Sequence, residues 1–115
     1  KHKKMEYLVT GSALVSGSYT TILQAAADKK LLIKTIHLAN ITSSNAEVNL
    51  QWIDSSESNR EYFLAKDVVI PNASSFQAID GTFVLDNNDS LRAFTNLTES
   101  IDASVSFMEI SNSEG

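Results

Sequence analysis

The apolar residues of this 115-residue chain recur at every second position within short segments, and this spacing constrains the fold more than any other feature. A period of two places the apolar side chains on one face of a β-strand, whereas an amphipathic helix needs a period near 3.6. The clearest case is residues 46–53, where Val48, Leu50 and Trp52 alternate with Glu47 and Asn49. The pattern therefore predicts half-buried strands.

Turn residues divide the apolar segments at regular intervals. Gly, Asn, Asp and Ser favour turns because they accept backbone conformations that other residues avoid. They separate expected strands that include residues 5–10, 31–40, 46–53, 60–64, 68–70, 90–95 and 103–110. No segment is long enough for the crossover helices of a parallel sheet. The chain is therefore expected to be all-β, an antiparallel β-sandwich of jelly-roll or immunoglobulin-like type with about eight short strands.

The length and the polar ends of the chain indicate its domain organisation. A chain of 115 residues matches one domain, and no break in composition divides it. We therefore expect residues 1–115 to form a single β-sandwich domain. Residues 1–5 and 111–115 are short and polar, so we expect flexible terminal arms there. No apolar run approaches the roughly 20 residues of a membrane-spanning helix, so no membrane partner is expected.

The charge of the chain is acidic, with 14 Asp and Glu against 9 Lys and Arg and a net charge of −5. Proteins that bind nucleic acid use clustered Lys and Arg against phosphate, so no nucleic-acid partner is expected. The positive charges cluster at one place, which comprises Lys1, His2, Lys3 and Lys4. We interpret these four residues as a candidate interaction arm that reaches for a neighbouring protein.

The residue types needed for catalysis or metal binding are scarce. The chain has no Cys and two His, so it offers neither a Cys nucleophile nor a thiolate metal site. His37 alternates with Thr35 and Ala39 and is expected on a sheet face in a structural role. Residues 86–90 resemble a calcium loop, but Leu97 stands where the bidentate Glu would be, so a β-turn is favoured. We expect no catalytic residue, no metal, no cofactor and no enzymatic activity.

Two aromatic residues permit a different function. Trp52 and Tyr62 flank a polar loop at residues 54–59, and exposed aromatics in such a place can form a platform for sugars. A carbohydrate-binding module is therefore an alternative. Trp52, however, continues the face of Val48 and Leu50, which favours a place in the core.

Several segments together resemble the small virion proteins of tailed bacteriophages. They are residues 19–30 (YTTILQAAADKK), 33–40 (IKTIHLAN), 62–64, 69–71, 81–85, 89–93 and 105–110, so that the resemblance covers roughly residues 20–110. It implies a β-sandwich on the virion that decorates or cements the capsid at capsomer junctions. The partners that the resemblance implies are the major capsid protein and neighbouring virion proteins. Because the exposed strand edges of a sandwich need partners or protection, we also expect a homo-oligomer. A component of the neck, tail or fibre base is the alternative location, and the resemblance implies no active-site residues.

Overall fold

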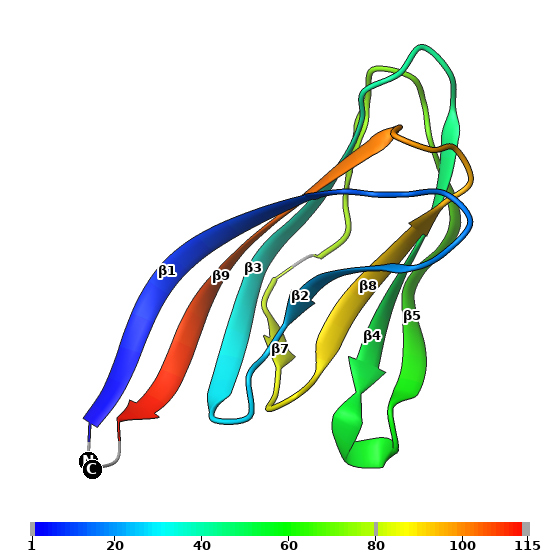
Figure 1. The fold of residues 1–115 in the computed structure, drawn as a ribbon. Coiled ribbons are helices and arrows are strands. Elements are labelled where there is room, and N and C mark those ends of the chain that lie inside the picture. The colour runs from blue at the N-terminus through cyan, green and yellow to red at the C-terminus, as the bar shows by residue number, and fades with distance from the viewer. Residues whose placement is uncertain (1, 80, 114–115) are drawn as a thin grey trace.

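A computed structural model describes residues 2–79 and 81–113 as strands joined by turns, with one short 3₁₀ helix (Figure 1). The strands are β1 (His2–Ala13), β2 (Thr20–Gln24), β3 (Lys29–Asn40), β4 (Ala46–Asp54), β5 (Arg60–Ile70), β6 (Ser75–Gln77), β7 (Phe83–Leu85), β8 (Ser90–Thr95) and β9 (Ile101–Ser113), and the 3₁₀ helix is η1 (Ser55–Glu57). No helix in this described part of the chain is long and apolar enough to cross a membrane.

The nine strands form two antiparallel sheets packed as a sandwich (Figure 1). The five-stranded sheet has the order β1-β9-β3-β6, with β7 also paired to β3, and the four-stranded sheet has the order β2-β8-β4-β5. The expected all-β antiparallel sandwich is therefore confirmed, and its jelly-roll-like form is one of the two types expected. The alternating sequence pattern produces this result because each strand must bury one face against the opposite sheet.

The core fills the space between the inner faces of the two sheets. On β4, Val48 and Leu50 are fully buried, and Trp52 continues the same face with its side chain half-buried against the core. The largest fully buried side chains are Leu14, Leu31, Ile33, Ile36, Leu38, Leu50, Ile70, Leu85, Leu91, Ile101, Val48 and Val105. Each buried Leu, Ile or Val side chain contributes about 1.5–3 kcal/mol to stability. The predicted core face of β4 is thus confirmed.

β5 differs from the sequence prediction, which places separate strands at residues 60–64 and 68–70. The structure joins them into one strand, although its register to β4 shifts between Val48 and Leu50 and again between Leu50 and Gln51. Asp67 takes a positive φ of 54° there, and its N–H donates to Asn49 Oδ1 at 2.6 Å. This hydrogen bond holds β5 to β4 where the register shifts, so the two strands remain paired on both sides of the irregularity.

The expected terminal arms are a further difference. Residues 2–5 belong to β1 and residues 111–113 to β9, and the two strands pair from His2 opposite Ser113 through Met5 opposite Ile110. Lys1 and residues 114–115 lie outside the described residues. The arms were expected because these segments are polar, but backbone pairing between the chain ends supplies hydrogen bonds that need no apolar side chain.

Candidate interaction surface

The outer face of the five-stranded sheet carries exposed apolar side chains in register across its strands. The strand pairing places Tyr7, Met108, Leu32 and Val84 in one row across β1, β9, β3 and β7. Met5 and Ile110 form the next row on one side, and Val9 lies on the other. We call these seven residues the apolar band: Met5, Tyr7, Val9, Leu32, Val84, Met108 and Ile110.

The apolar band is exposed where β1 and β7 contribute to it. Tyr7 and Val9 keep 74% and 75% of their surface accessible, Met5 61% and Val84 45%. Single exposed apolar residues are common on protein surfaces, but a contiguous group of them marks a contact surface. The apolar band is therefore the best candidate for a binding face.

The outer face of the four-stranded sheet is different because its polar groups satisfy one another. Arg92 donates through Nε to Gln51 Oε1 at 2.7 Å and through Nη2 to Glu61 Oε2 at 2.6 Å. The Arg92 guanidinium also lies 4.5 Å from the ring centre of Tyr19, which packs against Phe94. This cross-strand network engages its charges within the sheet, and the exposed large apolar side chains on this face, Phe63 and Val69, are fewer than the four exposed ones of the apolar band.

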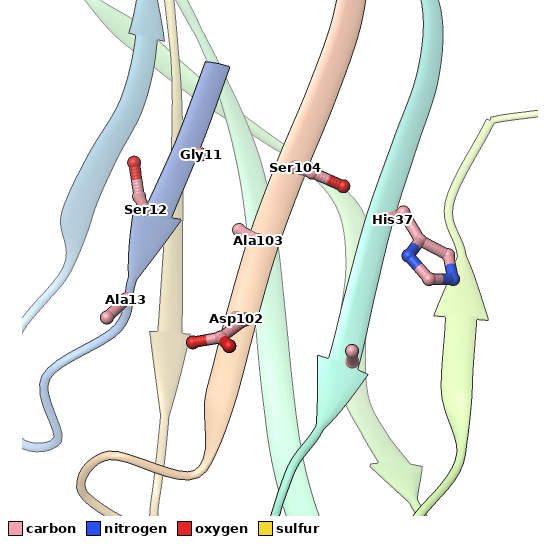
Figure 2. Close-up of a pocket in the computed structure, with 8 residues that line it drawn as sticks. Gly11, Ser12, Ala13, His37, Asp102, Ala103 and Ser104 are labelled. Carbon is pink, nitrogen blue, oxygen red and sulfur yellow. The ribbon is translucent and has the colours of Figure 1, made fainter. Parts of the chain in front are cut away.

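The band borders a shallow depression of about 400 Å³ on the same outer face (Figure 2). The depression exists because small residues line it, among them Gly11, Ala13 and Ala39. His37 lies at its rim on the outer face of β3 and is half-buried, so the predicted sheet-face position is confirmed. In Figure 2 the His37 ring lies toward β6, whereas the Asp102 carboxylate points away from it on β9. The two groups therefore do not form the paired arrangement that activates a nucleophile.

The acidic turn at residues 86–89 is confirmed as a β-turn. The Asp89 N–H donates to the Asp86 carbonyl at 3.0 Å, and Asn88 takes a positive φ of 66°. The buried Asp89 carboxylate accepts from Trp52 Nε1 at 3.2 Å, from the Ser55 N–H at 2.9 Å and from the Asp86 N–H at 3.2 Å. These donors use the carboxylate oxygens that a cation would need. Among the described residues, no group of three or more His, Cys, Asp or Glu is placed to hold a metal ion.

The rings of Trp52 and Tyr62 stack face to face. They do not lie side by side, as they would in an open platform for a sugar. Their rings stack with centres 4.9 Å apart and planes at 21°, and Phe83 meets Trp52 edge-on at 5.5 Å. The Arg60 guanidinium lies 4.6 Å from the Tyr62 ring centre. The Tyr62 hydroxyl donates to Glu57 Oε1 at 3.0 Å, and this hydrogen bond raises the pKa of Tyr62. The aromatic faces that a sugar would stack on are thus largely engaged within the protein.

The described part of the candidate interaction arm belongs to the strand that carries Met5, Tyr7 and Val9, but Lys4 points to the opposite face of that strand. Lys4 is exposed on β1, next to Met5. His2 and Lys3 belong to the same strand by their backbone, while their side chains and all of Lys1 lie outside the described residues. Sequence reasoning missed the contribution of Met5, Tyr7 and Val9. The signal was their odd-numbered spacing, which alternates with Lys4 and Glu6.

Comparisons with known proteins find similarity in structure alone. No protein-family profile matches the chain, and no curated protein matches it in sequence. A chain of the Bacillus endospore appendages, described as disulfide-linked pili, superposes with a TM-score of 0.55 at 9% identity, covering 96% of this chain and 88% of that one. The shared property is the fold.

Two virus structures show the same likeness. A chain of the infectious bursal disease virus T13 particle matches with a TM-score of 0.56 at 8% identity and covers 97% of this chain. A chain of the Gx strain of that virus matches with a TM-score of 0.51 at 10% identity and covers all of this chain. This chain spans about a third of either viral chain, with 32% and 34% covered. The fold is therefore one that subunits of pili and of viral particles also use.

Proposed function

We propose that this chain is a non-enzymatic structural subunit of a virion, which decorates or cements the capsid of a tailed phage by binding at capsomer junctions. The observation that carries the proposal is the apolar band on one outer face of the sandwich. Burial of apolar surface is the main favourable term in most protein association, and such a band supplies it.

Three further observations support the proposal. The sandwich has the fold of chains from pili and from viral particles, which are repeating assemblies. The sequence resembles small virion proteins of tailed phages. The 115 residues also lack Cys, so they cannot form disulfide links of the kind named for the Bacillus pili. Contacts made by these residues therefore include no disulfide, and many symmetric copies can make each modest contact effective.

The proposed partners are the major capsid protein, neighbouring virion proteins and further copies of this chain. The proposed location is the capsid surface, in preference to the neck, tail or fibre base. A carbohydrate-binding function is not favoured, because Trp52 and Tyr62 stack on each other. Nucleic acid is not a proposed partner, because the net charge is −5 and Lys4 lies beside apolar residues and Glu6.

The test is binding to tailed-phage capsids that lack the protein. We expect the purified chain to cosediment with the particles and to raise the temperature or osmotic stress at which they open. Stoichiometry of purified virions should give hundreds of copies for a capsid protein and a few for a neck or tail protein. Absence of binding to any shell would overturn the proposal, and a few copies per particle would move it to the tail.

A further inference from the structure

The edges of the two sheets differ in how well they are protected against pairing with another chain. An edge strand presents unpaired N–H and C=O groups, and proteins blunt such edges with short strands, bulges or charges. On the four-stranded sheet, β2 has 5 residues and a register shift, while β5 has register shifts and the positive-φ residue Asp67. On the five-stranded sheet, β6 and β7 have 3 residues each.

β1 is the exception among these edges. It has 12 residues, and its register to β9 runs without a shift from His2 to Ala13. In Figure 1 its N-terminal half lies beside β9 at the left, away from the four-stranded sheet. Lys4, Glu6, Met5 and Tyr7 are accordingly exposed on its two faces. β1 therefore offers a long, regular and accessible edge for an added strand.

The charges on the inner-facing side of β1 have a self-complementary order. Glu6 lies opposite Glu109 on β9, and Lys4 lies opposite Ser111, which in turn lies opposite Lys29 on β3. Like charges directly opposite each other on a sheet are destabilising. Lys29 Nζ reaches Glu109 Oε1 at 3.4 Å, so Glu109 has a counter-charge on its β3 side. At the free edge of β1, a cation beside Glu6 would offset the like charges of Glu6 and Glu109. An anion beside Lys4 would likewise balance the row that contains Lys4 and Lys29.

We propose that two copies of this chain pair antiparallel through β1, with Met5 opposite Met5 of the second copy. This register places Lys4 opposite Glu6 of the second copy and Glu6 opposite Lys4, so each row gains an opposite charge at the shared edge. The five-stranded sheets become one continuous sheet, and the two apolar bands join on the same face. This inference rests on the proposed function, because it names the second copy as the partner that widens the face offered to a capsid.

Neighbouring registers fit the charges less well. Met5, Tyr7 and Val9 of the two copies share a face only if an odd-numbered residue of one copy lies opposite an odd-numbered residue of the other. A register in which an odd-numbered residue lies opposite an even-numbered one is therefore excluded. A register centred on Glu6 would place Glu6 opposite Glu6. A register centred on Tyr7 would place Lys4 opposite Thr10 and leave it without a direct counter-charge. Only the register centred on Met5 pairs both charges.

The test is the oligomeric state of the free protein, measured by sedimentation equilibrium with charge variants. Lys4→Glu alone and Glu6→Lys alone should each raise the dimer dissociation constant on the order of tenfold, because each places like charges opposite. The double variant should restore dimerisation because it exchanges the two charges. Glu47→Lys, at an exposed position of β4 in the other sheet, is the control and should leave the dissociation constant unchanged.

Cross-linking tests the register directly. The chain has no native Cys, so Met5→Cys gives one thiol per copy, and oxidation should link two copies because opposed antiparallel residues lie about 4.5–5.5 Å apart at Cα. Tyr7→Cys is the matched variant and should cross-link poorly. The proposal would be overturned if the protein were a monomer at all concentrations, or if the charge variants left the dimer dissociation constant unchanged. Preferential cross-linking of the Tyr7→Cys variant would also overturn it. These assays contain no capsids, so their failure is separate from a failure of particle binding.

Discussion

Asn40 at the end of β3 donates through Nδ2 to the carbonyl of Ile70 at the end of β5, with the two atoms 2.9 Å apart. This hydrogen bond joins the two sheets of the sandwich. The same Nδ2 donates to the Ser44 carbonyl, and Oδ1 accepts from both the N–H and the hydroxyl of Thr42. A buried amide with both ends satisfied holds the β3–β4 loop against the end of β5.

Replacing Asn40 by Asp should therefore destabilise the fold. The change removes the donor and directs a carboxylate oxygen at the Ile70 and Ser44 carbonyls, so we expect a loss of about 2–4 kcal/mol in the free energy of unfolding. Urea denaturation followed by circular dichroism measures it. Asn96→Asp is the matched control, because the exposed Asn96 only accepts, from the Glu47 N–H, and should change stability by less than about 0.5 kcal/mol. Equal effects of the two variants would contradict the role given to Asn40.

Replacing Asp89 by Asn tests the acidic turn as a structural element. The amide would direct N–H groups toward donors that include Trp52 Nε1, so we expect a loss of about 1–3 kcal/mol. Trp52 fluorescence should respond, because its indole loses a charged acceptor. Asp28→Asn removes a charge at an exposed turn and serves as the control. A stable Asp89→Asn variant with unchanged Trp52 emission would refute this interpretation.

Replacing Tyr7 and Val9 together by Ser should leave folding intact and weaken capsid binding. Both side chains are mostly exposed, so the free energy of unfolding should change by no more than about 0.5 kcal/mol per site. Binding should fall on the order of tenfold or more, because two apolar contacts are lost. The control is Val69→Ser on β5, where Val69 is 54% exposed on the other sheet. If the control lowers cosedimentation as much as the double variant, the apolar band is not the binding face.

The pKa of Tyr62 offers a check on the loop that follows β4. The Tyr62 hydroxyl donates to Glu57, and ionisation would break that bond, so the pKa lies above the ordinary value of about 10. The stabilising contribution is complete below about pH 10 and is lost as the pH rises through the folded pKa. Glu57→Ala should lower the Tyr62 pKa toward its ordinary value in a tyrosinate absorbance titration. Tyr62→Phe identifies which absorbance transition belongs to Tyr62, because that transition disappears in this variant. An unchanged titration in Glu57→Ala would show that the hydrogen bond does not cause the raised pKa of Tyr62.

Glycans should leave Trp52 fluorescence unchanged. The indole is half-buried and contacts Tyr62 and Phe83, so little of its ring is available for a sugar. A titration with a panel of oligosaccharides measures the response. Tyr62→Ala removes the ring that stacks on Trp52. Quenching of this variant by a glycan would show that Trp52 fluorescence reports contact at this site. Saturable quenching of the unmodified protein would favour the carbohydrate-binding module over the structural subunit.

Local sequence was sufficient to predict the structure of short segments whose conformation does not depend on distant residues. The alternation in residues 46–53 determined which face of β4 enters the core, because a strand side chain can point to only two sides. The turn at residues 86–89 followed from residue types that accept turn conformations, and Asn88 adopts one. The fold class followed from the same two signals repeated along the chain.

Only the tertiary structure decided the ends of the chain and the binding face. Residues 2–4 are all polar types, and the partners of this strand end in β9 lie about a hundred residues away along the chain, so no local pattern could reveal the pairing. The apolar band likewise needs Leu32, Val84 and Met108 from three other strands to become continuous with Tyr7. The sequence by itself determined that this chain forms half-buried strands with few catalytic residue types. The tertiary structure decided which strand became a long open edge, because edges and faces arise only when distant strands align.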